Sequence, residues 1–396
     1  QSMEKLHIAI VGRRNSGKSS LINVLTGQKV AIVSDVPGTT TDPVKRSYEI
    51  PGFASVVFID TAGIDDTGEL GRQRIAKTTE ILPQSDFILL LITENRFEAM
   101  EENLVRQIQN LHIPFLILHN KSDILSLHPD VKNTLESRYK TQVIDFCCRR
   151  PENISELFEA IRKLKQISTS PSLLGKIIRP RDILLLVTPI DSEVPVGRLI
   201  LPQVQMIRDI LDNHSVSIVL QPEEISSFLL TTGIRPRLVI TDSQVFKKVA
   251  EQIPANIPLT SFSIVLAHRK GYFQEYIKGT RTIDRLQDGD TILLLESCSH
   301  HTTCEDIGRV KIPALLKKYT GKQLNFEFIP ALDPLEKSPS AYALVIQCGG
   351  CMVTSQQLQT RLRPFIESGI PVSNYGMTLA FLNGIFERSI QEWEKE

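Results

Sequence analysis

The stretch LHIAIVGRRNSGKSS, residues 6–20, decides the fold of the first part of the chain. Leu6–Val11 has the apolar pattern of a short buried strand, and a helical pattern runs from Ser20 to Leu25. Between them lies the spacing GxxxxGKS, whose glycines let backbone N–H groups curl around phosphates at a helix N-terminus. The stretch therefore predicts an α/β domain with a phosphate-binding loop after its first strand.

The residues around this loop have distinct expected roles. Lys18 is expected to reach the β- and γ-phosphates, while the Ser19 hydroxyl binds Mg²⁺. Asp60 follows the predicted strand Val56–Ile59, where it would hold Mg²⁺ through water, and Gly63 would offer its N–H to the γ-phosphate. The other residues predicted to line the phosphate site are Gly12, Asn15, Ser16, Gly17 and Ser20.

A second motif predicts which base is bound. Asn120-Lys121-Ser122-Asp123 follows the predicted strand Phe115–Leu118 and has the pattern NKxD. The carboxylate of Asp123 can accept two hydrogen bonds from the guanine edge, whereas adenine has no such pair of donors. The sequence therefore favours GTP over ATP.

Two further segments complete the expected nucleotide site. A switch is expected at residues 37–42, where Thr40 would close on Mg²⁺ when the γ-phosphate is present. Cys147-Cys148 follows the predicted strand Val143–Phe146, where the guanine-clamping motif is usually Ser-Ala-Lys. We interpret this cysteine pair as part of the base pocket, because adjacent cysteines ligate one metal poorly and free cysteine packs as a small apolar residue.

Together these motifs resemble the Ras-like GTPases and, within them, the subgroup of the tRNA-modifying GTPase MnmE and of Era. Ile64 stands where Ras-type proteins carry the glutamine that orients water, and Asn15 matches the asparagine that binds K⁺ in that subgroup. The resemblance implies K⁺-stimulated hydrolysis, with K⁺ supplying the charge that an arginine finger supplies elsewhere. The alternative is that Asn15 only stabilises its loop.

Composition limits the other possibilities. A chain of 396 residues fits two or three domains, and its 45 basic and 45 acidic residues give no sign of a nucleic-acid or membrane partner. No apolar run approaches the length of a membrane helix. Six cysteines in a chain without a secretory signal argue against a disulfide framework and for a metal or redox role in the cytoplasm.

A three-cysteine pattern lies in the last third of the chain. Cys298-Ser299-His300 follows the apolar run Ile292–Leu295, and Gln347-Cys348-Gly349-Gly350-Cys351 follows Ala343–Ile346. Both runs predict buried strands, and parallel strands meet at their carboxyl ends, where α/β proteins bind ligands. Three thiolates and a nearby imidazole there suit zinc or an iron–sulfur cluster.

This pattern is similar to the CxH…HCxxC signature of the [FeFe]-hydrogenase maturation GTPase, the HydF family. Residues 306–313, 348–352, 374–376 and 197–204 also resemble that family, and the resemblance covers the whole chain. It implies a [4Fe-4S] cluster on Cys298, Cys348 and Cys351, with a fourth iron left for an exchangeable ligand. One departure is that Gln347 stands in place of the second histidine.

The resemblance also implies a role. The protein would be a GTP-hydrolysing scaffold that receives a transient diiron subcluster precursor from two radical-SAM maturases and delivers it to apo-[FeFe]-hydrogenase. It implies an α/β architecture in which a Ras-like P-loop GTPase domain precedes two smaller domains with mainly parallel sheets. The predicted boundaries are 1–168 for GTP binding, 177–261 for homodimerisation and 262–396 for the cluster.

Some assignments stay open at this point. His300 could ligate the cluster or orient a neighbouring group, and Cys304 is a spare thiol close enough to replace a ligand. Glu305 or Asp306 could offer an oxygen to an open iron site. The alternative function is a tRNA- or ribosome-associated GTPase with a structural zinc, which the balanced charge disfavours.

Overall fold

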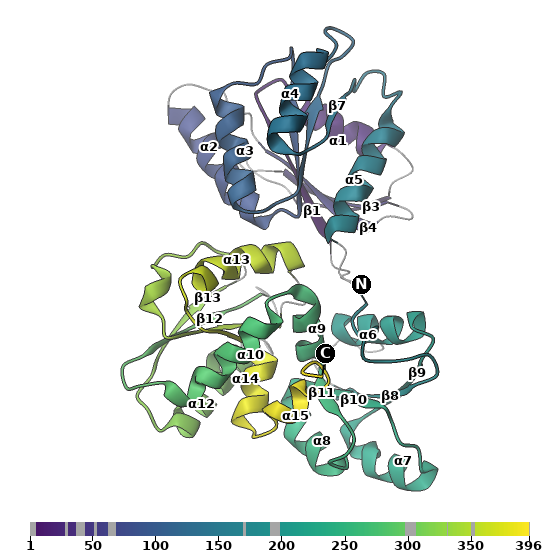
Figure 1. The fold of residues 1–396 in the computed structure, drawn as a ribbon, viewed down its shortest axis with the longest axis vertical. Coiled ribbons are helices and arrows are strands. Elements are labelled where there is room, and N and C mark those ends of the chain that lie inside the picture. Colours follow the sequence, from purple (N-terminus) through teal and green to yellow (C-terminus); the bar gives the residue numbers. More distant parts are fainter. Residues whose placement is uncertain are drawn as a thin grey trace. The chain divides into compact units, whose positions relative to one another are not determined.

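The computed structural model describes residues 5–27, 31–36, 44–50, 54–61, 69–168, 172–190, 199–297, 306–330, 332–349 and 353–395. These fall into two compact units, Met3–Thr169 and Ser170–Glu396 (Figure 1). Each unit is an α/β structure whose sheets are mostly parallel. The predicted fold class is thereby confirmed.

The first unit is built on a seven-stranded sheet of order β2-β3-β4-β1-β5-β6-β7. Strand β3 runs antiparallel to both β2 and β4, and β4, β1, β5, β6 and β7 are parallel. The strands are β1 (Leu6–Gly12), β2 (Ala31–Val36), β3 (Val44–Ile50), β4 (Ala54–Asp60), β5 (Phe87–Ile92), β6 (Phe115–His119) and β7 (Val143–Asp145).

Helices cover both faces of this sheet. They are α1 (Lys18–Thr26), α2 (Glu69–Ile81), α3 (Ala99–Asn110), α4 (Pro129–Tyr139) and α5 (Ile154–Ser168). Side chains of α1 and α5 share one apolar core with Ile8 and Ile10, whereas α3 and α4 share the other with Ala9 and Val11. Alternate residues of β1 thus pack on opposite faces, as expected for a parallel strand covered on both sides.

The second unit contains two four-stranded parallel sheets, of orders β11-β10-β8-β9 and β13-β12-β14-β15. The strands of the first are β8 (Ile183–Val187), β9 (Val216–Leu220), β10 (Leu238–Thr241) and β11 (Leu259–Ser261). Those of the second are β12 (Thr291–Leu295), β13 (Asn325–Ile329), β14 (Leu344–Gln347) and β15 (Val372–Asn374).

The helices of this unit lie between and after the strands. The first sheet has α6 (Leu201–Asp212), α7 (Ile225–Thr232), α8 (Phe246–Gln252) and α9 (Phe262–Lys270). The second has α10 (Phe273–Arg281), α12 (Ile312–Thr320), α13 (Ser355–Glu367), α14 (Tyr375–Leu382) and α15 (Phe386–Ile390), with a π-helical turn at Asp306–Lys311.

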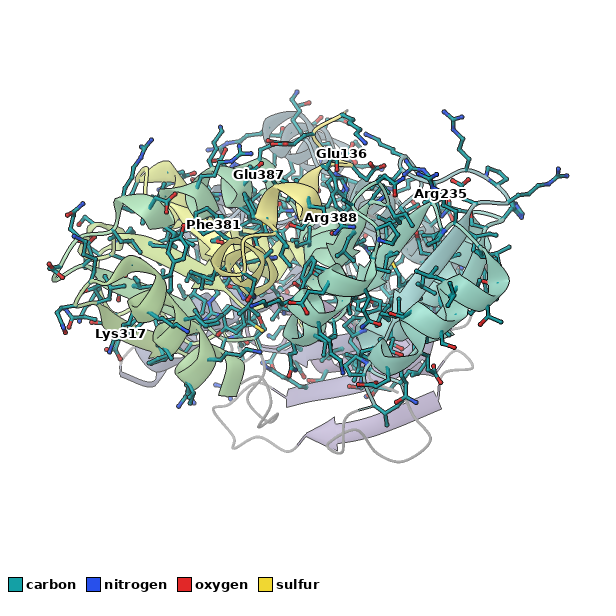
Figure 2. The ribbon with its side chains drawn as sticks, turned by 90° about the horizontal axis from the view of Figure 1, so that it is seen from below. Glu136, Arg235, Lys317, Phe381, Glu387 and Arg388 are labelled. Atoms are coloured by element: carbon teal, nitrogen blue, oxygen red, sulfur yellow. The ribbon has the colours of Figure 1, made fainter. Side chains whose placement is uncertain are left out.

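One apolar core runs through both sheets of the second unit. It contains the β8 and β10 side chains of the first sheet together with Leu293, Leu295 and Val345 of the second. On α15, Arg388 donates through Nη2 to the carbonyls of Pro254 and Ile257 at 2.8 and 2.9 Å (Figure 2). The division of this unit into separate domains at residues 261 and 262 therefore stays a prediction.

Candidate functional site

The phosphate loop has the predicted strand–loop–helix context. It leaves β1 at Gly12 and enters α1 at Lys18. Gly12 and Gly17 have φ angles of 153° and 96°, which disfavour residues with a side chain. A Cβ on Gly12 would lie 2.6 Å from the Leu91 carbonyl oxygen, and one on Gly17 would lie 2.2 Å from Nδ2 of Asn120. A side chain at either position would clash with neighbouring atoms, so this loop conformation favours glycine at both.

The lysine and serine that close the loop contact the loop backbone and the end of β4. Lys18 is buried, and its Nζ donates to the carbonyl oxygens of Gly12 and Arg13 at 3.2 and 2.8 Å. The Ser19 hydroxyl donates to Oδ2 of Asp60 at 2.5 Å. Because a hydroxyl and a carboxylate of this kind hold Mg²⁺ in P-loop enzymes, the donor set present fits the ion.

The NKxD segment lies at the carboxyl end of β6 and is tied to the phosphate loop. Asn120 is almost fully buried, and its Nδ2 donates to the carbonyl of Ser16 at 2.8 Å. Its Oδ1 accepts the backbone N–H of Cys148 at 3.3 Å. One side chain thus joins the phosphate loop to the segment predicted to line the base pocket.

The carboxylate predicted to read guanine is accessible. The Asp123 side chain is 23% exposed and lies 3.8 Å from Nη1 of Arg149, which is itself 83% exposed. Lys121 has a φ of 64°, so the backbone turns sharply just before Asp123. The carboxylate is therefore partly accessible, with an exposed positive side chain as its neighbour.

The two adjacent cysteines, predicted to be part of the base pocket, lie against the apolar core of the first unit. Cys147 is buried, and Cys148 is half-buried against the core beneath α1 and α5. Burial raises the pKa of the Cys148 thiol to about 11, so the thiol stays protonated at neutral pH. A protonated thiol is a poor metal ligand, which agrees with the interpretation of this pair as packing residues.

A buried histidine beneath the NKxD segment was not foreseen from the sequence. His119 ends β6 with no exposed surface, and its Nδ1 lies 2.7 Å from Oδ1 of Asp145. Its Nε2 accepts the backbone N–H of Asn95 at 3.1 Å. The ring therefore fastens three segments together directly below Asn120, and no local pattern in the sequence marks it.

Other predicted residues of the nucleotide site are placed less centrally or are not described. Asn15 is exposed, with a φ of 59°, and Ser16 is buried. Ser20 is exposed on α1. Thr40, Gly63 and Ile64 lie outside the described residues. We call the carboxyl ends of β1, β4 and β6 with their following loops the nucleotide edge.

The second candidate site is the carboxyl edge of the sheet that contains β12 and β14. These strands are neighbours, with Leu295 opposite Gln347, and the N–H of Cys348 donates to the Leu295 carbonyl at 2.8 Å. Cys348 is buried in the core behind β14. We call this the cysteine edge. The prediction that the runs before the two cysteine segments form buried strands of one parallel sheet is confirmed, and the structure adds that these strands are neighbours.

Gln347, which stands in place of the expected histidine, joins the two segments. It is almost fully buried, and its Nε2 donates to Oγ of Ser297 at 2.8 Å and to the Cys348 carbonyl at 3.1 Å. Its Oε1 is buried without a hydrogen-bond partner among the described residues. Ser297 directly precedes Cys298, so Gln347 holds the start of one cysteine segment against the other.

Two arginines hold the residue before Ser297. Arg309 forms a two-point ion pair with the buried carboxylate of Glu296, at 2.7 and 2.8 Å. Arg361 donates through Nη1 to the Glu296 backbone carbonyl at 2.7 Å. Burial lowers the pKa of Arg361 to about 10, which still leaves the guanidinium charged at neutral pH. The strand end that leads to Cys298 is therefore held by two guanidinium groups, one of which is neutralised by the Glu296 carboxylate.

The remaining predicted ligands cannot be placed. Cys298, His300, Cys304, Glu305 and Cys351 lie outside the described residues, and of Asp306 only the backbone is described. Within the described ranges, no three His, Cys, Asp or Glu side chains gather to hold a metal. A buried thiol beside a strand end that leads to a second thiol nevertheless fits a metal cluster by its donor chemistry. No helix in the described part of the chain is long and apolar enough to cross a membrane.

Comparison with known families gives three matches along the chain. Residues 7–121 match the model described as a 50S ribosome-binding GTPase. Residues 173–271 match the hydrogen maturase F dimerization domain, and residues 274–392 match the hydrogen maturase F tetramerization domain. The last two matches together cover more than half of the chain.

Curated relatives match the first unit. The tRNA modification GTPase MnmE of Nitrosomonas europaea is 39% identical over 127 residues, which are 32% of this chain and 28% of that protein. The GTPase Der of Wolinella succinogenes is 34% identical over 145 residues, 35% of this chain and 31% of that protein. The chain thus spans less than a third of the length of these relatives.

Solved structures of two GTPases also align with this chain. Era of Aquifex aeolicus aligns with a TM-score of 0.35 and 20% identity, covering 55% of this chain and 93% of that one. The G domain of the FeoB iron transporter of T. maritima aligns with a TM-score of 0.31 and 20% identity, covering 41% of this chain and 99% of that one.

Proposed function

We propose, on the premise that the chain belongs to the hydrogen maturase F family, that it is a GTP-hydrolysing scaffold for [FeFe]-hydrogenase maturation. In this proposal a [4Fe-4S] cluster is held by Cys298, Cys348 and Cys351. The protein receives the diiron subcluster precursor from two radical-SAM maturases and delivers it to apo-[FeFe]-hydrogenase. The observation that supports the proposal is the adjacency of β12 and β14, because the two strands that lead to the cysteine segments end at one sheet edge.

We propose that the nucleotide edge binds and hydrolyses GTP. Lys18 neutralises the β- and γ-phosphates, and Ser19 and Asp60 hold Mg²⁺, whose charge stabilises the charge that develops on the phosphoryl group. Asp123 accepts hydrogen bonds from guanine, and Thr40 and Gly63 complete the γ-phosphate site. We propose that Asn15 helps to hold K⁺, which adds positive charge beside the transferred phosphoryl group.

At the cysteine edge, the chain's own residues hold and orient the ligands. Gln347 and Arg361 fix the two strand ends from which Cys298 and Cys348 depart. A bound cluster would supply an iron site for an exchangeable ligand. Because both Gln347 nitrogen contacts go to protein oxygens, we propose that Gln347 braces the two segments. We propose that the three cysteines ligate the cluster, with His300 beside them.

The first sheet of the second unit is the proposed homodimer surface. Its edge strand β9 exposes Val216 and Val219, and the adjacent α6 exposes Val204 and Leu211, each with 41% or more of its surface accessible. An open strand edge flanked by apolar side chains is a template for pairing with another chain. A second copy of this chain would cover it.

A maturation assay tests the scaffold role. Apo-[FeFe]-hydrogenase is mixed with both radical-SAM maturases and with the wild type, Cys348→Ser or Lys18→Ala. We expect neither variant to activate the hydrogenase, because one lacks the cargo site and the other lacks nucleotide turnover. Full activation by Cys348→Ser would overturn the scaffold role of the cysteines, and full activation by Lys18→Ala would remove GTP turnover from delivery.

A further inference from the structure

The arginine that follows the first glycine of the phosphate loop is held from outside the loop. Arg13 Nε lies 2.6 Å from Oε1 of Glu101, and its Nη2 lies 3.0 Å from Oε2 of the same carboxylate. Nη2 also lies 3.2 Å from Oε2 of Glu98. Both acids belong to the start of α3, so a helix 85 or more residues away in sequence holds the loop.

The acceptor of this ion pair is rigid. The Glu101 side chain is only 2% exposed, and its Oε2 also accepts the backbone N–H of Glu98 at 2.9 Å, which caps α3. A buried carboxylate with two partners cannot turn toward water without losing both. Arg13 is therefore bound to a fixed point of the domain core.

The backbone of Arg13 faces the other way, into the loop. Its carbonyl oxygen accepts from Lys18 Nζ at 2.8 Å and from the N–H of Ser16 at 3.3 Å. Because the Arg13 side chain is bound to Glu101, the Arg13 carbonyl that accepts the Lys18 hydrogen bond is held in place as well. A shift of Arg13 would move the loop backbone, whose N–H groups cradle phosphate, whereas the Lys18 ammonium sits on a flexible four-carbon stem and can still follow the phosphates.

We propose that Arg13 is a positioning residue, which, through Glu101, sets the shape of the phosphate loop and hence the affinity for guanine nucleotides. The inference rests on the proposed nucleotide site. Because the loop N–H groups cradle the α- and β-phosphates, which GDP and GTP share, Arg13 affects both nucleotides equally. It contributes to binding and leaves the chemical step unchanged.

The test compares affinities in the full chain, using fluorescent GDP and a fluorescent non-hydrolysable GTP analogue. Arg13→Gln is expected to weaken both by about tenfold and by the same factor, with kcat at saturating GTP within about twofold of the wild type. The double variant Arg13→Gln with Glu101→Gln is expected to recover part of the loss, because two neutral amides can pair where one amide leaves a buried charge.

Arg138→Ala is the matched control. Arg138 forms a comparable 2.7 Å ion pair with Glu102 on the same helix, but this pair is exposed and does not contact the phosphate loop. We expect its nucleotide affinities to equal those of the wild type. Arg13→Lys, which keeps the charge but loses the two-point geometry, is the second variant if Arg13→Gln fails to fold, and is expected to bind both nucleotides about threefold more weakly.

Three results would overturn the inference: a folded variant with both affinities within about twofold of the wild type, a loss confined to the GTP analogue, or a lower kcat at unchanged affinity. The second result would instead place Arg13 against the γ-phosphate. A wild-type chain that binds neither nucleotide would refute the proposed nucleotide site itself, which distinguishes that failure from a failure of this inference.

Discussion

The nucleotide edge and the cysteine edge are both carboxyl edges of parallel sheets, but their polar side chains are arranged differently. At the nucleotide edge, residues proposed to bind the ligand contact one another or the phosphate loop, as Ser19 does with Asp60 and Asn120 with the Ser16 carbonyl. At the cysteine edge, Gln347 and Arg361 hold segments of the backbone. At the nucleotide edge the binding side chains themselves are held in place. At the cysteine edge the strand ends that lead to the cysteines are held in place.

This comparison predicts that the two edges fail independently, and the largest expected effect is at the nucleotide edge. Lys18→Ala should reduce GTP hydrolysis by about a hundredfold or more, because it removes the positive charge from the β- and γ-phosphates. Phosphate release measured under saturating GTP checks this. The same protein should bind as much iron as the wild type after anaerobic reconstitution; a loss of iron would show that the edges are coupled.

The reciprocal variant is Cys348→Ser. Loss of one of three thiolates should abolish stable iron binding, because a serine hydroxyl is a poor ligand for iron in a sulfur-bridged cluster. Iron content and absorbance measure this, with GTP hydrolysis expected to stay within about twofold of the wild type. Cys148→Ser is the cysteine control for iron, since its thiol lies at the other edge. Full iron binding by Cys348→Ser would contradict the assignment.

Base recognition sharpens the description of the nucleotide edge. Asp123→Asn should weaken GTP binding by about a hundredfold and favour xanthosine triphosphate, because the amide presents a donor where guanine also presents donors. Competition between the two nucleotides, measured by fluorescence, reports the change. A variant with unchanged GTP affinity would show that Asp123 does not contact the base.

The smallest expected effect concerns the cation. We predict that hydrolysis is about tenfold faster in KCl than in NaCl at equal ionic strength, since K⁺ held by Asn15 adds charge at the phosphoryl group. Asn15→Ala should remove most of this difference while leaving GDP affinity unchanged. Equal turnover of the wild type in the two salts would contradict a K⁺ role.

Much of the fold could be predicted because its strands are short apolar runs bounded by motifs. The runs predicted at Leu6–Val11 and Phe115–Leu118 form strands that end one residue later than predicted, and the runs before Cys298 and Cys348 form neighbouring parallel strands. The strand at Asn325–Ile329 was missed because it lies at a sheet edge and is only partly buried, so it lacks a continuous apolar run.

The site could be predicted only where its residues form local motifs. The contacts of Arg13 with Glu101, of His119 with Asp145 and of Arg361 with Glu296 join residues that are 26 to 88 positions apart. Such pairs depend on how helices and strands pack, and no spacing pattern in the sequence predicts them. Gln347 was noted as a departure from the family signature, but its hydrogen bond to Ser297 became visible only once β12 and β14 were neighbours.

Metal analysis of the full chain, reconstituted anaerobically with iron and sulfide, tests the central claim most directly. The account predicts a brown protein with a broad band at roughly 400 nm, about four iron atoms per chain and an electron paramagnetic resonance signal after reduction. A colourless protein that retains zinc and takes up no iron would contradict it. That result would favour a GTPase with a structural zinc at the cysteine edge.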